Sequence, residues 1–139
     1  MIKRVFIDSD IILDVATGRM PFVQNSKIVL SIIENGKAFG MISSNSVTNI
    51  YYILRRLSSD EKARIFIKKI LKYIDVISAD HKNILDALDS KFNDFEDAVQ
   101  NYSALSNLCD CIITRNTEDY KKSELTIYSP IEFISQFQL

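Results

Sequence analysis

The chain has 139 residues, of which 47% are hydrophobic and 25% charged, and its formal net charge is −1. These values predict one compact domain over residues 1–139 with a substantial core, and they leave no room for a second domain. They exclude a long disordered or linker-rich chain, because the sequence holds 3 Gly and 2 Pro. No apolar run approaches the about 18 residues that a membrane span needs. A near-neutral chain has no general attraction for nucleic acid, so any RNA contact must be local.

Apolar runs alternate with amphipathic segments along the chain, a pattern typical of a parallel sheet covered by helices. We predict strands at residues 4–7, 39–42, 75–77, 111–114 and 126–128. Helices are predicted at residues 21–34, 43–57, 58–74, 80–89, 94–107 and from 129 onward. The first strand begins directly after the N-terminus without the pattern of a signal peptide, so we expect a cytoplasmic protein.

Capping residues mark several of these helix ends. Ser58 and Glu61 have the spacing of a capping box, and Asn35-Gly36 is a stop signal for the preceding helix. Asn93 and Glu96 have the same spacing as the first pair, which offers a purely structural reason for the acid at position 96.

Three acidic stretches, far apart in the chain, carry most of the functional information. They are Asp8-Ser9-Asp10, Asp94-Phe95-Glu96-Asp97 and Asn116-Thr117-Glu118-Asp119. The first and third follow buried strands, and ligands of open parallel sheets bind at the carboxyl ends of the strands. Carboxylates gathered there repel one another and resist desolvation unless a cation neutralises them. The pattern therefore predicts a divalent-metal site, and sites of this kind without His or Cys ligands usually act on phosphate.

Structural alternatives exist for several of these acids. Asp94 and Glu96 could simply stabilise a helix N-terminus, and Asp10 or Asp14 could be solvent-facing. Asp119 could cap a turn. A helix N-terminus also stabilises a carboxylate at Asp97 without any metal. Asp8 and Asp97 nevertheless have the weakest structural alternatives, because neither strand termination nor capping requires an acid at those places.

Four blocks of the sequence resemble those of PIN-domain ribonucleases, in the same order and spacing. They are Phe6-Ile7-Asp8-Ser9-Asp10, Ile42-Ser43-Ser44-Asn45-Ser46-Val47-Thr48-Asn49, Asp94-Phe95-Glu96-Asp97-Ala98-Val99-Gln100 and Ile113-Thr114-Arg115-Asn116-Thr117-Glu118-Asp119. The last two blocks are specific to one PIN subgroup, and residues 129–133 are similar to its closing helix.

The resemblance implies an α/β PIN-like fold, with a central sheet of four or five parallel strands flanked by helices. It also implies endoribonuclease activity that depends on Mg²⁺ or Mn²⁺. Many small prokaryotic members are VapC-type toxins, so a cognate antitoxin and a homodimer are expected as well as an RNA substrate. By position, Asp8, Asp97 and either Asn116 or Asp119 fall on the family's acidic positions.

One position departs from the family pattern. The second block commonly supplies a Glu in the first turn of its helix, and Asn49 stands there instead. An amide carries no charge, so metal affinity should be weaker or cleavage lost. Glu96, next to Asp97, could restore the missing charge.

The expected mechanism is metal-assisted hydrolysis with Asp8 and Asp97 as the main metal ligands. Asp119 and Asn116 complete the shell or orient water, and Asp10 lies beside them. Supporting residues are Ser43 and Thr114 as hydroxyl donors and Arg115, which could contact a phosphate or pair with a neighbouring acid.

Two rival functions stay open from the sequence alone. Asp8 and Asp10 also fit the nucleophile and acid/base pair of haloacid-dehalogenase-type phosphatases, although that scheme needs an acidic pair after a later strand. With Asn49 in place of Glu, the chain could instead be a PIN-like module that binds RNA or protein without cutting.

Overall fold

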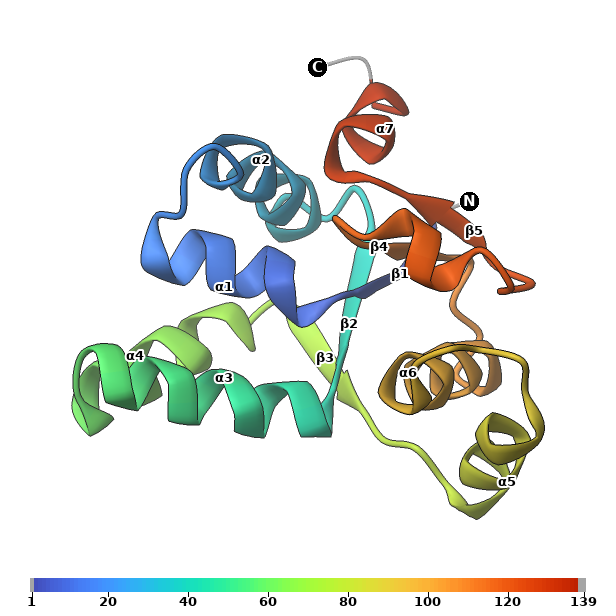
Figure 1. Ribbon diagram of the computed structural model, residues 1–139. Helices are drawn as coiled ribbons and strands as arrows, with labels where there is room; N and C mark the ends of the chain where they lie inside the picture. Colours follow the sequence, from blue (N-terminus) through green and yellow to red (C-terminus); the bar gives the residue numbers. More distant parts are fainter. Residues whose placement is uncertain (1, 138–139) are drawn as a thin grey trace.

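The computed structural model describes residues 2–137 and shows an α/β fold around a five-stranded sheet (Figure 1). The strands are β1 (Arg4–Ile7), β2 (Phe39–Ser43), β3 (Ile74–Ile77), β4 (Cys111–Ile113) and β5 (Thr126–Tyr128). Their order is β3-β2-β1-β4-β5, and every neighbouring pair is parallel. The predicted parallel sheet between helices is confirmed, with β1 at its centre.

Seven helices are described, together with one 3-10 turn that follows β4. They are α1 (Ser9–Thr17), α2 (Val23–Glu34), α3 (Ser44–Leu57), α4 (Asp60–Ile70), α5 (His81–Asp89), α6 (Phe95–Ser106), α7 (Pro130–Ser135) and the 3-10 turn η1 (Thr117–Tyr120). None of the helices in residues 2–137 has the length and apolar character needed to cross a membrane.

The side chains of the sheet alternate between two buried clusters, as the period of a strand requires. Val5, Ile7 and Ile113 point into the larger cluster, which the helices α1, α2, α3, α4 and α7 complete. Phe6 and Ile112 point to the other face, against α6 and η1. α5 packs on the outside of α6 (Figure 1). This sandwich keeps β1 and β4 buried and brings their carboxyl ends to one edge.

The helix α1 was not predicted. Its apolar residues Ile11, Ile12, Val15 and Ala16 do have helical spacing, and Ile11 and Ile12 are fully buried. Gly18 ends the helix with φ of 64°, a left-handed conformation that glycine adopts without strain. Because α1 starts directly after β1, it fixes how the residues around Asp8 face the sheet edge.

Two predicted capping boxes are wrong by one residue. Ser58 ends α3, since its N–H donates to the carbonyl of Leu54, and Ser59 caps α4 instead by accepting from Lys62 N at 3.1 Å. Asp94, rather than Asn93, caps α6, and its Oδ1 accepts from Asp97 N at 2.9 Å.

Two predicted helix boundaries also differ from the structure. α4 ends at Ile70, and Ile74 belongs to β3 rather than to the helix. α2 begins at Val23 instead of residue 21.

Candidate active site

The carboxyl ends of β1 and β4 meet because the two strands are neighbours, with Ile7 opposite Ile113. The N–H of Asp8 donates to the carbonyl of Ile113 at 3.0 Å, which carries the ladder one residue beyond β1. Thr114 is fully buried, and its hydroxyl donates to Asp8 Oδ2 at 2.8 Å. The first carboxylate is therefore held against the end of the neighbouring strand.

Asn116 extends this network to Asp10. Its backbone N–H donates to Thr114 Oγ1 at 3.0 Å, and its side-chain amide donates to Asp10 Oδ2 at 3.2 Å. The four predicted site residues Asp8, Asp10, Thr114 and Asn116 thus form one hydrogen-bonded group.

Asp97 approaches the same edge from the first turn of α6. Tyr120, on η1, donates its hydroxyl to Asp97 Oδ1 at 3.3 Å. The ring of Tyr120 is buried, with 1% of its surface exposed. Burial, followed by the charges of Asp8 and Asp97, raises the pKa of Tyr120, so its hydroxyl stays protonated and keeps donating. Tyr120 was not predicted as a site residue, although it directly follows Asp119.

Burial and neighbouring negative charge make the carboxyl groups of this cluster harder to ionise. Burial, followed by the charges of Asp94, Asp8 and Asp119, raises the pKa of Asp97 to about 6. Burial also raises the pKa of Asp8, against the opposing hydrogen bond from Thr114, and the charge of Asp10 adds to the rise. A cation is the group that would relieve this repulsion.

The donor chemistry of this edge fits a hard divalent ion, because carboxylate oxygens are the ligands that Mg²⁺ and Mn²⁺ prefer. Within residues 2–137, no three His, Cys, Asp or Glu side chains already stand in an arrangement that could hold one ion. Asp8 Oδ2 accepts from Thr114, and Asp97 Oδ1 accepts from Tyr120. The residues fit the ion in kind.

Arg115 pairs with acids of α1. Its Nε lies 2.9 Å from Asp14 Oδ2, its Nη2 lies 3.9 Å from Asp10 Oδ2, and its guanidinium carbon lies 4.0 Å from the ring centroid of Phe22. Of the two roles expected for Arg115, the structure shows the pairing. Asp14 has 1% of its surface exposed, so the alternative of a solvent-facing acid is wrong for this residue.

Three other predicted residues lie apart from the hydrogen-bonded group. Ser43 caps α3, since its hydroxyl accepts from Ser46 N at 3.0 Å and donates to Ser46 Oγ at 2.9 Å. Asn49 is exposed on α3. Glu96 lines a neighbouring pocket together with Ser43.

Comparison with known proteins decides the family. A family model described as the PIN domain matches residues 4–118. The chain belongs to the PIN-domain family. This PIN domain is 24% identical over 140 residues to ribonuclease VapC1 of Aquifex aeolicus (strain VF5), an alignment that covers 97% of this chain and 96% of that protein.

Solved structures share the PIN fold with this chain. VapBC2 from Rickettsia felis, bound to a DNA fragment from its promoter, gives a TM-score of 0.69 at 12% identity and covers 91% of this chain and 98% of that one. A toxin–antitoxin complex from Klebsiella pneumoniae gives 0.67 at 19% identity, with coverage of 91% and 97%. The resemblance to PIN domains is confirmed, and the haloacid-dehalogenase alternative loses its basis.

Proposed function

We propose that this PIN domain is an Mg²⁺- or Mn²⁺-dependent endoribonuclease that hydrolyses RNA phosphodiester bonds as the toxin of a toxin–antitoxin pair. The observation that carries the proposal is the meeting of Asp8 and Asp97 at the carboxyl edge of the sheet, where burial and neighbouring acids raise the pKa of both carboxyl groups. Similarity to a protein named ribonuclease VapC1 and to chains of toxin–antitoxin complexes supports it.

Asp8, Asp97 and Asp119 would hold the metal ion, with Glu96 as the candidate for a fourth carboxylate. When bound, Mg²⁺ or Mn²⁺ activates water for attack on phosphorus and offsets charge on the phosphate oxygens. Two negative groups, the acidic cluster and the RNA backbone, would otherwise repel each other.

The chain's own residues hold these carboxylates in place. Thr114 donates to Asp8 Oδ2 and accepts from the N–H of Asn116, so its single hydroxyl proton has one direction and Asp8 one preferred orientation. The buried Tyr120 donates its hydroxyl to Asp97 Oδ1 and so orients that carboxylate. Asn116 restrains Asp10 through its amide. Preorganisation of this kind lowers the cost of assembling a catalytic site.

An antitoxin partner, a homodimer and a cytoplasmic location belong to the same proposal. The structures that share the fold include toxin–antitoxin complexes, which supports an antitoxin partner. The purified protein must therefore be freed of any bound partner before its activity is measured.

A second function has one observation in its favour. Asn49 is exposed on α3 where PIN ribonucleases commonly carry a Glu, so the site has one carboxylate fewer. A non-catalytic PIN module would bind RNA or protein through the same edge and leave RNA intact.

RNA cleavage by partner-free protein separates the two functions. Wild type with Mg²⁺ or Mn²⁺ should cut RNA, and Asp8→Asn should abolish cutting, whereas Asp89→Asn, on the exposed end of α5, serves as the matched control. Because water is the nucleophile, the products should lack 2′,3′-cyclic phosphate. Equal cutting by wild type and Asp8→Asn, or cyclic-phosphate products, would contradict the proposal. Intact RNA with folded wild type would favour the binding module.

A further inference from the structure

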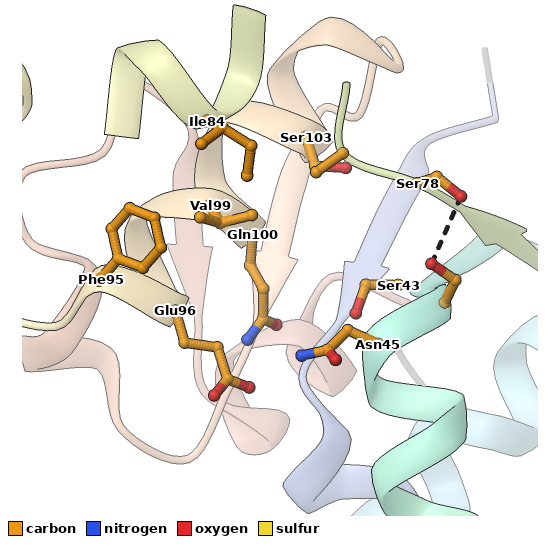
Figure 2. A pocket seen from close by; sticks show the side chains of 11 residues that line it. Ser43, Asn45, Ser78, Ile84, Phe95, Glu96, Val99, Gln100 and Ser103 are labelled. Atoms are coloured by element: carbon orange, nitrogen blue, oxygen red, sulfur yellow. Dashed lines mark hydrogen bonds between the residues drawn. The ribbon is translucent and has the colours of Figure 1, made fainter. Parts of the chain in front are cut away.

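A pocket of about 440 Å³ lies beside the acidic cluster, between the start of α3, the segment after β3 and the first turns of α6 (Figure 2). This volume falls within the range of about 300–1,000 Å³ that is typical of ligand sites. Glu96 lines the pocket, and the next residue is Asp97. Ser43 lines the other side of the pocket. On the neighbouring strands β1 and β2, Phe6 pairs with Met41, and Asp8 and Ser43 each lie two residues beyond that pair. The pocket therefore adjoins the place where the scissile phosphate would lie.

Two buried polar groups in this pocket lack partners. Gln100 and Ser103 are 6% and 1% exposed, and Gln100 Oε1 and Ser103 Oγ have no hydrogen-bond partner. An unsatisfied buried acceptor costs about 1–3 kcal/mol. Figure 2 shows Gln100 pointing into the pocket toward Asn45, which comes from the opposite wall. A ligand with N–H donors at its edge would satisfy groups that the protein leaves unpaired.

The apolar part of the pocket lining favours a different feature of the ligand, a flat hydrophobic surface. Phe95 is 50% exposed, and Ile84 and Val99 stand beside it. An exposed aromatic ring at the mouth of a pocket offers a stacking surface for a flat ring. The ligand is therefore expected to be planar, with polar groups at its edge.

The charge of the pocket lining favours the base of a nucleotide over its phosphate. Among the described residues that line the pocket, Glu96 is the charged one. Its carboxylate repels phosphate and accepts hydrogen bonds from amino groups. The neutral base is thus favoured over the backbone.

We propose that this pocket binds one unstacked RNA base that carries an exocyclic amino group, from a nucleotide next to the phosphate at the acidic cluster. The inference rests on the proposed ribonuclease function. Adenine and cytosine both fit, because each places an amino donor beside a ring-nitrogen acceptor, so a carboxamide such as that of Gln100 can both donate to and accept from the same edge, and Glu96 can accept from the amino group. Uracil has no amino group. Its single N3–H can reach only one of these acceptors, and its two carbonyl oxygens face the others.

Nucleoside binding to metal-free protein tests the pocket without relying on cleavage. Adenosine, cytidine and uridine are titrated into ¹⁵N-labelled protein, and amide shifts are followed by NMR. Adenosine and cytidine should shift amides of residues 43–45, 78–79 and 95–103, and uridine should bind about tenfold more weakly, which corresponds to about 1.4 kcal/mol.

Matched variants locate the contact. Gln100→Met removes the amide at similar volume, and Gln24→Met makes the same change at an exposed position of α2. Phe95→Leu removes the stacking ring. Phe39→Leu is its control, because it makes the same change at a residue outside the pocket that is 52% exposed. The pocket variants should lose most adenosine binding, whereas both controls should keep it.

Uridine binding equal to adenosine binding, shifts confined to other surfaces, or Gln100→Met indistinguishable from Gln24→Met would overturn the inference. Those results would leave the ribonuclease proposal standing. Conversely, selective adenosine binding by a protein that cuts no RNA would refute the ribonuclease and retain the base pocket.

Discussion

Arg115 should stabilise the fold far more than its position beside the proposed active site suggests. It joins the segment after β4 to α1 through Asp14, whose surface is 1% exposed, while the Arg115 side chain is 16% exposed. Ser26 Oγ also donates to Asp14 Oδ2, at 3.2 Å, and Asp14 Oδ1 has no partner. The variant Arg115→Met therefore leaves a buried carboxylate without its counter-charge.

The expected loss is about 3–5 kcal/mol, the cost of removing one partner from a buried ion pair. Loss of the guanidinium from the ring of Phe22 adds to it. Domains are stable by only about 5–15 kcal/mol, so a change of this size should be unmistakable.

Equilibrium urea unfolding measures the loss. Arg64→Met is the matched control, since Arg64 Nε also lies 2.9 Å from a carboxylate, that of Asp60, but these side chains are 67% and 53% exposed. An exposed pair should contribute less than about 1 kcal/mol. Adding Asp14→Asn to Arg115→Met should recover part of the stability, because a neutral amide is cheaper to bury. Equal losses in Arg115→Met and Arg64→Met, or no recovery in the double variant, would refute the reasoning.

Three further predictions concern other parts of the molecule. Because the pKa of Asp97 is raised to about 6 from its ordinary 3.8, the folded, metal-free protein retains a proton that the unfolded chain releases. This group should make the unfolding free energy rise as the pH falls from about 7 to about 4, and Asp97→Asn should remove that part of the slope in urea titrations; an identical slope in both proteins would contradict it. Gly40→Ala should destabilise by about 1–3 kcal/mol, because an added Cβ would lie 2.9 Å from Ile33 Cγ2 and 3.1 Å from Ile7 Cδ1. An unchanged urea midpoint would show that β2 and α2 can shift apart freely. Glu96→Gln separates two roles by calorimetry: a fourth metal ligand predicts weaker Mn²⁺ binding, and a base contact predicts weaker adenosine binding with Mn²⁺ binding retained. If both affinities stay at wild-type values, neither role holds.

Much of the fold could be predicted from the sequence because its signals are local. Apolar runs at Val5-Phe6-Ile7 and Cys111-Ile112-Ile113 identify strands buried on both faces, and these are the central neighbours β1 and β4. The helix α1 is harder to recognise, because its first turn overlaps the acidic stretch that follows β1. The cap of α4 lies one residue later than predicted, because two consecutive serines offer the same side chain. The hydrogen bonds from Ser58 N–H to the Leu54 carbonyl and from Lys62 N–H to Ser59 Oγ distinguish them.

The site residues also differ in whether the sequence alone could reveal them. Asp8 and Asn116 follow predicted strands and Asp97 lies near a predicted helix start, so these three could be proposed as site residues from residue type and position alone. Tyr120 and Asp14 could not, because their importance comes from packing. Tyr120 reaches Asp97 across 23 positions of the chain, and Asp14 meets Arg115 only after α1 folds against the loop that follows β4.

Cleavage of one RNA across a Mn²⁺ titration, with metal-stripped, partner-free protein, tests the central claim most directly. Wild type should cut RNA only as Mn²⁺ is added and stop when EDTA is present. Asp97→Asn should stay inactive over the same range, while Asp89→Asn should follow wild type. Cleavage that continues in the presence of EDTA would contradict a metal-dependent ribonuclease built on Asp8 and Asp97. So would cleavage by Asp97→Asn at the wild-type rate and with the wild-type metal dependence.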